Sequence, residues 1–238
     1  MIRLLCLPYA GASATIYARW RGRMPDWLEI ALVELPGRGA RGDEPPATHM
    51  RSLAKALADE LGPRLHQPYA LFGHSLGALL AFELAHALRD AQAPAPLALF
   101  ASGSRAPGVR AAQSNVEGLT DAALIERLRS LNGTPRAALE SAEIMQCFLP
   151  VLRADFLMCD RYEPVMRPAL DFPLHVLGGS RDDIGQGELL AWHAETSSPS
   201  SLDMFDGDHF FIHAHEGEVL HSVLARLAPL RDVAAAAR

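Results

Sequence analysis

The 238-residue chain is predicted to form an α/β fold, with a mostly parallel sheet flanked by helices. Two observations predict this class. Apolar runs of strand length alternate with longer helical patterns along most of the sequence, as parallel strands and their crossover helices do. One strand-to-helix junction also carries the segment GHSLG at residues 73–77, a G-x-S-x-G turn of the kind that follows a buried strand in such sheets.

The expected elements follow from the apolar pattern. Strands are expected where short apolar runs are bounded by turn residues, and helices where leucines recur every three or four positions. In chain order this predicts strands at 3–7, 28–35, 69–72, 97–100, 174–177 and 202–205, and helices at 14–25, 50–65, 76–88, 189–196 and 216–230.

One long stretch interrupts this alternation. Between Ser102 and Phe172 no strand is expected, whereas residues 119–129 and 137–161 have helical patterns. Roughly seventy residues exceed the dozen or so that a simple crossover between parallel strands needs. We therefore expect residues 1–238 to form a single domain, with a helical lid inserted at about 108–170.

The composition argues against several classes of protein. A net charge of −6 does not favour general binding to nucleic acid or to anionic membranes. No run of about 18 apolar residues is present, and the apolar run at 4–7 is too short for a signal peptide, so a cytoplasmic protein is expected. The cysteines lack metal-ligand spacing and are expected to be reduced thiols; they are Cys6, Cys147 and Cys159.

The turn at residues 73–77 is interpreted as a nucleophile elbow. A nucleophilic serine must project from a sharp, strained turn, and the flanking glycines permit it because a Cβ at either place would collide with neighbouring backbone. The helix after the turn directs its N-terminus at the serine, where the amide of Leu76 can help to hold an oxyanion. Ser75 is therefore the expected nucleophile, and a glycine-rich turn without catalytic role is the alternative.

The serine needs a base and an acid, which follow it in the order Asp or Glu and then His in this kind of site. His209 comes directly after the last expected strand, where sites form in open α/β sheets, and is the expected base; His213 and His215 are the alternatives. The acid should follow the preceding strand. Asp182 is the expected acid and Asp183 the alternative.

A second oxyanion donor should come from the loop after the first strand, PYAGAS at residues 8–13. Small residues allow the backbone of this loop to approach the serine. We expect the amide of Ala10 to be this donor, and an ordinary strand-to-helix turn is the alternative reading.

Six sequence blocks then recur in a recognisable order over nearly the whole chain. They are LPYAGASA at 7–14, ELPGRGARGDEPP at 34–46, FGHSLGALLAFELA at 72–85, ASGSRAP at 101–107, LPVLRADF at 149–156 and GDHFFI at 207–212. Together they resemble the type II thioesterases of nonribosomal peptide and polyketide biosynthesis. The medium-chain acyl thioesterases that act on fatty acid synthase are similar in the same way.

The resemblance implies an α/β-hydrolase fold and an editing or product-releasing enzyme. Such an enzyme hydrolyses acyl groups from the phosphopantetheine arm of an acyl or peptidyl carrier protein, uses no metal or organic cofactor, and is expected to be a monomer. Carried over by residue, the resemblance implies Ser75 as nucleophile, Asp182 as acid and His209 as base, with the amides of Ala10 and Leu76 forming the oxyanion hole.

This chain departs from the family pattern at two positions. Ala12 stands where the family usually has a second glycine, and Asp208 stands where it usually has a glycine before the catalytic histidine. Ala12 is a small change. Asp208 adds a carboxylate near His209, which either raises the basicity of the ring or faces solvent.

Two other functions fit the same residues. The chain could be an esterase or lipase of free small-molecule esters, because fold and triad do not select the substrate. It could also be a non-catalytic binding module on a hydrolase scaffold, although a complete triad in the expected order argues against that. The apolar side chains of the lid would be acyl contacts or core of the lid itself; they are Phe148, Leu149, Phe156 and Met158.

Overall fold

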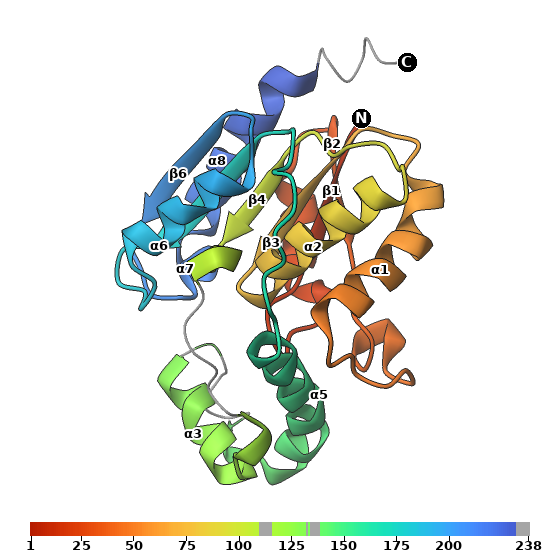
Figure 1. Cartoon of the computed structure of the whole chain (residues 1–238). Coiled ribbons are helices and arrows are strands. Elements are labelled where there is room, and N and C mark those ends of the chain that lie inside the picture. The colour runs from red at the N-terminus through yellow and green to blue at the C-terminus, as the bar shows by residue number, and fades with distance from the viewer. Residues whose placement is uncertain (110–115, 132, 134–138, 232–238) are drawn as a thin grey trace.

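The computed structural model has one sheet of six parallel strands, in the order β2-β1-β3-β4-β5-β6 (Figure 1). The structure describes residues 1–109, 116–131, 133 and 139–231. The strands are β1 (Ile2–Leu7), β2 (Leu28–Leu32), β3 (Tyr69–His74), β4 (Leu99–Ser102), β5 (Leu174–Gly179) and β6 (Ser200–Phe205). The predicted α/β class with a parallel sheet is confirmed.

Helices connect the strands. The α-helices in the described residues are α1 (Met50–Leu61), α2 (Leu76–Asp90), α3 (Asp121–Leu131), α5 (Ala142–Asp160), α6 (Gln186–Leu190), α7 (Phe211–Ala214) and α8 (Glu216–Leu227). Shorter 3₁₀ segments lie at Ala14–Arg23, Gly39–Arg41, Gly62–Arg64, Pro107–Val109, Val116–Gly118, Ala191–Glu195 and Ala228–Leu230.

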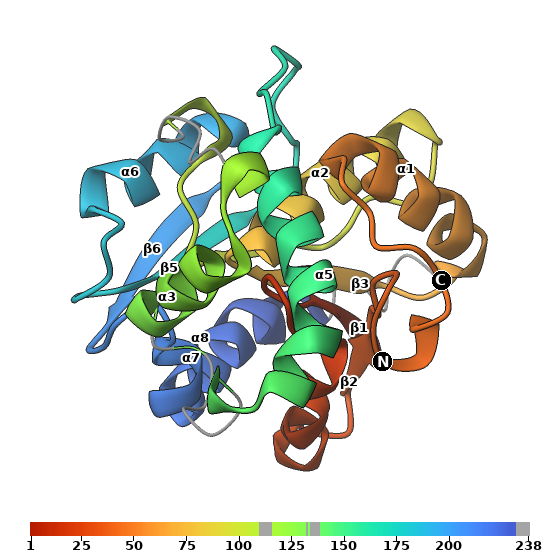
Figure 2. The same ribbon diagram turned by 90° about the horizontal axis from the view of Figure 1, so that it is seen from below.

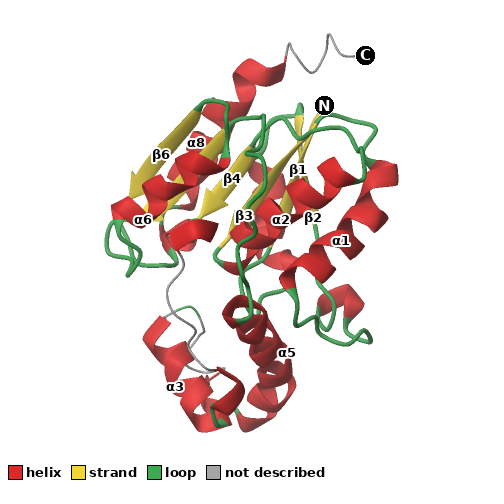
Figure 3. Ribbon diagram, in the orientation of Figure 1, coloured by secondary structure: helices red, strands yellow, loops and turns green. Residues whose placement is uncertain are grey.

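Both faces of the sheet are covered by helices (Figure 3). On one face, α1, α2 and α6 share a core with Leu5 and Leu7 of β1. On the other face, α8 and the 3₁₀ helix Ala14–Arg23 share a core with Leu4 and Cys6. Because successive residues of a strand point to opposite faces, a strand covered on both sides must be apolar at nearly every position. This explains the uninterrupted apolar runs that predicted β1 and β3.

Some element boundaries differ from those expected. The expected strand at 28–35 ends at Leu32, because the chain beyond it turns so that the Glu34 carboxylate accepts hydrogen bonds from the Ala14 amide and the Ser13 hydroxyl. The expected helix at 50–65 ends at Leu61, where Gly62 and a proline continue it only as a 3₁₀ turn.

The segment between β4 and β5 forms a helical insert, named here by its described residues 103–109, 116–131, 133 and 139–173. It contains α3 and α5, which enclose a small core of their own, and no strand of the sheet in its described part. α3 and α5 lie beyond the carboxyl ends of the strands, and α5 crosses the ends of β1 and β3 when viewed from below (Figure 2). Residues 110–115, 132 and 134–138 of the expected lid at about 108–170 lie outside the described residues.

No helix in the described part of the chain is long and apolar enough to cross a bilayer. Cys6 is buried in the sheet and Cys147 is exposed on α5, and both are free thiols, as expected.

Buried histidines should make the stability of the fold depend on pH, and two of them lie outside the site region, on α2 and β5. Burial, with nearby arginines acting in the same direction, lowers the pKa of His86 on α2 to about 3 and that of His175 on β5 to about 4. In the unfolded chain both rings take up protons below pH 6.5, their ordinary pKa. The unfolded state therefore binds more protons than the folded state between that pH and the folded pKa, and stability is lost as the pH falls.

We expect the free energy of unfolding to fall between pH 7 and pH 5 by on the order of 1 kcal/mol for each histidine, after allowing for partial solvent screening. Urea unfolding at a series of pH values measures this. His175→Gln should make the dependence less steep, since glutamine does not titrate and the other buried histidines remain. A variant with the same slope as the wild type would show that His175 does not contribute.

Candidate active site

Ser75 lies on a strained turn between β3 and α2. Its backbone has φ +56° and ψ −116°, a conformation that non-glycine residues rarely adopt. A Cβ on Gly73 would lie 2.0 Å from the carbonyl oxygen of Gly77, and a Cβ on Gly77 would lie 2.3 Å from that of Leu7. Both glycines are therefore required for the reason expected from sequence, and the turn projects Ser75 beyond the carboxyl edge of the sheet.

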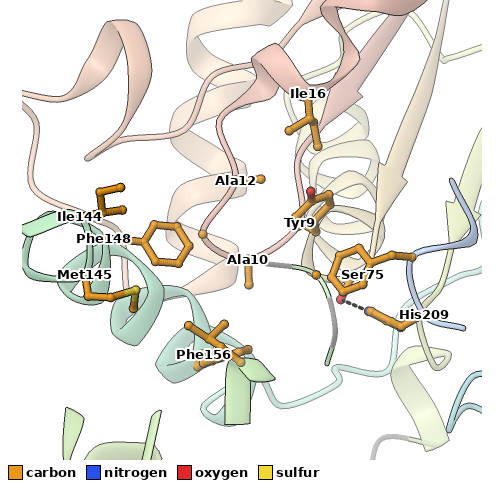
Figure 4. A pocket seen from close by; sticks show the side chains of 14 residues that line it. Tyr9, Ala10, Ala12, Ile16, Ser75, Ile144, Met145, Phe148, Phe156 and His209 are labelled. Atoms are coloured by element: carbon orange, nitrogen blue, oxygen red, sulfur yellow. Dashed lines mark hydrogen bonds between the residues drawn. The ribbon is translucent and has the colours of Figure 1, made fainter. Parts of the chain in front are cut away.

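Two successive hydrogen bonds link Ser75 to His209 and His209 to Asp182. The Ser75 Oγ is 3.0 Å from His209 Nε2 (Figure 4), and His209 Nδ1 is 2.8 Å from Asp182 Oδ2. The side chains of Asp182 and His209 are 5% and 17% exposed. With its proton on Nδ1, the ring donates to the carboxylate and leaves Nε2 free to accept the serine proton.

Parallel pairing of β5 and β6 explains why the side chains of Asp182 and His209 meet. Gly179 at the end of β5 pairs with Phe205 at the end of β6, so the loops after them start side by side. The Arg181 amide donates to the Gly207 carbonyl at 2.8 Å, and a Cβ on Gly179 would lie 2.4 Å from the Asp208 carbonyl oxygen. The two loops are thus packed backbone to backbone.

The alternative residues have other partners. Asp183 is exposed, and its carbonyl oxygen accepts from Arg105. His213 Nε2 lies 3.0 Å from the Tyr9 hydroxyl, and burial together with a nearby arginine lowers its pKa. His215 pairs with Glu218 on the surface.

Asp208, the departure next to His209, is exposed. Its carboxylate accepts a hydrogen bond from the Phe210 amide at 2.9 Å. It therefore caps the turn that carries His209, which corresponds to the solvent-facing alternative.

The loop after β1 lies beside the serine. Leu7 pairs with Gly73 in the sheet, and the chain order reverses between β1 and β3, which is where open α/β sheets form their crevice. Within the loop the Ala12 amide donates to the Tyr9 carbonyl at 3.0 Å. Ala10 lines the same cavity as Ser75, as an oxyanion donor would require (Figure 4).

An apolar cavity of about 310 Å³ opens onto Ser75 and His209. The insert and the loops around the serine supply its walls, which include Ile16, Leu128, Met145, Phe148, Phe156 and Phe210 (Figure 4). Of the four apolar side chains left open by sequence, Phe148 and Phe156 line the cavity, whereas Leu149 and Met158 are buried in the surrounding packing. Such a cavity suits an apolar chain.

Sequence reasoning missed two groups around the site. His74 is buried behind the serine, with Nδ1 2.9 Å from the Ser102 hydroxyl, and burial holds its pKa well below the usual value. Arg38 and Asp155 form a buried ion pair against the loop after β1. The sequence did contain one signal for Asp155, because a carboxylate within the apolar helical stretch of α5 indicates a buried polar contact.

The sequence profile of the thioesterase domain family matches residues 2–227. The chain belongs to this thioesterase family. The gramicidin S biosynthesis protein GrsT of Aneurinibacillus migulanus is 37% identical to the thioesterase over 227 residues, which cover 95% of this chain and 89% of GrsT.

Solved structures agree with this assignment. The type II thioesterase BorB from the borrelidin biosynthetic cluster superposes with a TM-score of 0.87 at 36% identity, covering 95% of this thioesterase and 92% of BorB. ClbQ from the colibactin NRPS/PKS pathway superposes with a TM-score of 0.92 at 33% identity, covering 98% and 99%. The resemblance to type II thioesterases and the α/β-hydrolase fold are therefore confirmed, and the chain is a thioester hydrolase of the serine-hydrolase type.

Proposed function

We propose that this thioesterase hydrolyses acyl groups from the phosphopantetheine arm of acyl or peptidyl carrier proteins, as an editing or product-releasing enzyme of polyketide or nonribosomal peptide synthesis. It acts as a cytoplasmic monomer through a triad of Ser75, His209 and Asp182. The observation that carries the proposal is the contact of 3.0 Å between Ser75 Oγ and His209 Nε2 at one end of an apolar cavity. The pathways named for BorB and ClbQ support the substrate class.

The proposed reaction proceeds through an acyl-enzyme. Ser75 attacks the thioester carbonyl while His209 Nε2 takes its proton, and Asp182 stabilises the imidazolium that results. The tetrahedral oxyanion is held by the amides of Ala10 and Leu76. The carbon–sulfur bond then breaks, and His209 returns the proton to the departing thiol. Water deacylates Ser75 by the same steps, giving a carboxylic acid.

The helical insert serves as a lid in this proposal. Its side chains Leu128, Met145, Phe148 and Phe156 contribute much of the apolar wall, so an acyl chain of low polarity would be sheltered from water beside Ser75. The thiol end of the substrate carries the pantetheine arm and must leave toward the carrier protein.

A substrate panel tests the proposal. The same butyryl group is presented as a carrier-protein thioester, as a free pantetheine thioester and as a p-nitrophenyl ester at equal concentration. We expect kcat/KM to be highest for the carrier-protein thioester, by tenfold or more over the free thioester, because remote contacts with the carrier are added to the same chemistry (about 1.4 kcal/mol). Preference for the p-nitrophenyl ester, with no gain from the carrier, would instead identify an esterase.

A further inference from the structure

A carboxylate of the insert reaches the loop after β1. Asp155 on α5 is fully buried, and its Oδ2 accepts a hydrogen bond from the Gly11 amide at 2.7 Å. Arg38 donates to both carboxylate oxygens, from Nη1 at 2.6 Å and from Nη2 at 2.7 Å. Arg38 Nη1 also lies 3.4 Å from the carbonyl oxygen of Ala12. The buried ion pair therefore contacts two successive residues of this loop: Asp155 of α5 contacts Gly11, and Arg38, which follows β2, contacts Ala12.

The loop is a turn whose shape depends on the peptide that Asp155 holds. The Ala12 amide donates to the Tyr9 carbonyl, and Gly11 at the third position has φ +78°, as in a type II turn. Types I and II differ by a reversal of the central peptide, which here joins Ala10 to Gly11. Because the amide of that peptide donates to Asp155, the carboxylate favours the type II orientation.

Packing of α5 against the same turn is close. A Cβ on Gly11 would lie 2.5 Å from Phe148 Cζ and 2.9 Å from Leu152 Cδ1. The helix and the turn thus form one packed unit. Displacement of α5 would break the bond to Gly11 or move the turn with it.

We propose that Asp155, oriented by Arg38, is a positioning residue for the oxyanion hole. It fixes the peptide between Ala10 and Gly11 and, with the packing of α5 on Gly11, holds the whole turn in place, so that the preceding Tyr9–Ala10 peptide, which carries the Ala10 amide, stays beside Ser75. The inference rests on the proposed function in that it takes the Ala10 amide as an oxyanion donor. It adds that a residue of the insert, distant from the serine in sequence, determines the geometry of that donor.

The free energy of the Arg38–Asp155 ion pair shows how a stabilising role can be separated from a positioning role. Buried ion pairs contribute little net stability, since desolvation offsets the attraction, but removal of one partner leaves an uncompensated charge. A single substitution at Arg38 or Asp155 would therefore lower activity both by destabilising the fold and by releasing the turn, and the two effects could not be distinguished. Both charges must be removed together.

The test compares Arg38→Met/Asp155→Asn with Arg38→Met/Asp155→Leu. Asparagine and leucine have the same number of side-chain heavy atoms and both branch at Cγ, and both variants lack the buried charges, but only asparagine accepts a hydrogen bond from the Gly11 amide. Thermal unfolding establishes that each is folded. Kinetics with butyryl-pantetheine give kcat and KM. The affinity for butylboronic acid, which adds to the serine as a tetrahedral anion, reports directly on the oxyanion site.

We expect the leucine variant to have kcat lower than the asparagine variant by about 10- to 100-fold, less than the loss of a whole donor, with KM changed by less than about threefold. Its affinity for butylboronic acid should fall by a similar factor. Equal kcat and equal boronic-acid affinity in the two variants would overturn the inference.

Two further readouts keep the outcome decisive. If the wild type does not hydrolyse thioesters, the proposed function fails, while the boronic-acid and p-nitrophenyl butyrate comparisons still decide the role of Asp155. If the leucine variant does not fold, hydrogen exchange of the Gly11 amide in the boronic-acid complex of the wild type decides it. Protection of the Gly11 amide by about 100-fold or more supports its hydrogen bond to Asp155, and exchange at the rate of an exposed amide overturns the inference.

Discussion

Replacement of Ser75 by alanine is expected to lower kcat for thioester hydrolysis by about 10⁴- to 10⁶-fold, with the protein still folded. The hydroxyl is the proposed nucleophile, and its removal leaves only substrate binding and the oxyanion site. Replacement of His209 by alanine should cost a comparable factor, because the base 3.0 Å from Ser75 Oγ is then missing. Residues that act as one unit are not additive, so the double variant should be no slower than the slower single variant.

His215→Ala is the matched control for the histidine. His215 lies in the same segment but pairs with Glu218 on the surface. The kcat of His215→Ala should therefore stay within about threefold of that of the wild type. The measurement is steady-state release of thiol, with fluorophosphonate labelling of the serine as a second readout. A Ser75→Ala protein that keeps more than about one per cent of wild-type kcat would exclude Ser75 as the nucleophile.

The elbow could be predicted from sequence because its determinants are local. Gly73, Ser75 and Gly77 are separated by single residues, and the clashes that a Cβ would cause involve the turn and the strand beside it. The positions of the loops that carry Asp182 and His209 were also predictable, since parallel strands end at the same edge of a sheet.

The contact of Asp155 with the loop after β1 could not be predicted in this way. Asp155 is separated from Gly11 by 144 positions and from Arg38 by 117. Hydrophobic periodicity predicts that α5 is a helix and which face is apolar, but it carries no information on which backbone amide a buried carboxylate will meet. That contact depends on the packing of the insert across the sheet.

The sequence favoured Asp182 over Asp183 as the acid, but the local pattern alone does not separate two adjacent carboxylates. Asp182 and Asp183 follow the same strand, and which of them faces the histidine depends on the course of the turn. In the structure Asp182 Oδ2 lies 2.8 Å from His209 Nδ1, and its Oδ1 lies 3.4 Å from the Ile184 amide. The Asp183 side chain is exposed.

Asp182→Asn is therefore expected to lower kcat by about 10³- to 10⁴-fold with little change in stability. If the asparagine oxygen keeps the place near the Ile184 amide, its NH₂ group faces His209 Nδ1 and donates to it. The ring proton then moves to Nε2, which can no longer accept the proton of Ser75. Steady-state kinetics of thioester hydrolysis measures the loss.

Asp183→Asn makes the same chemical change one residue away and separates the two carboxylates. Because only the carbonyl oxygen of Asp183, and not its carboxylate, contacts Arg105, this variant should keep kcat within about threefold of the wild type. The opposite ranking, with Asp183→Asn the slower enzyme, would mean that the turn after β5 rearranges when substrate binds, and the acid would have to be reassigned to Asp183.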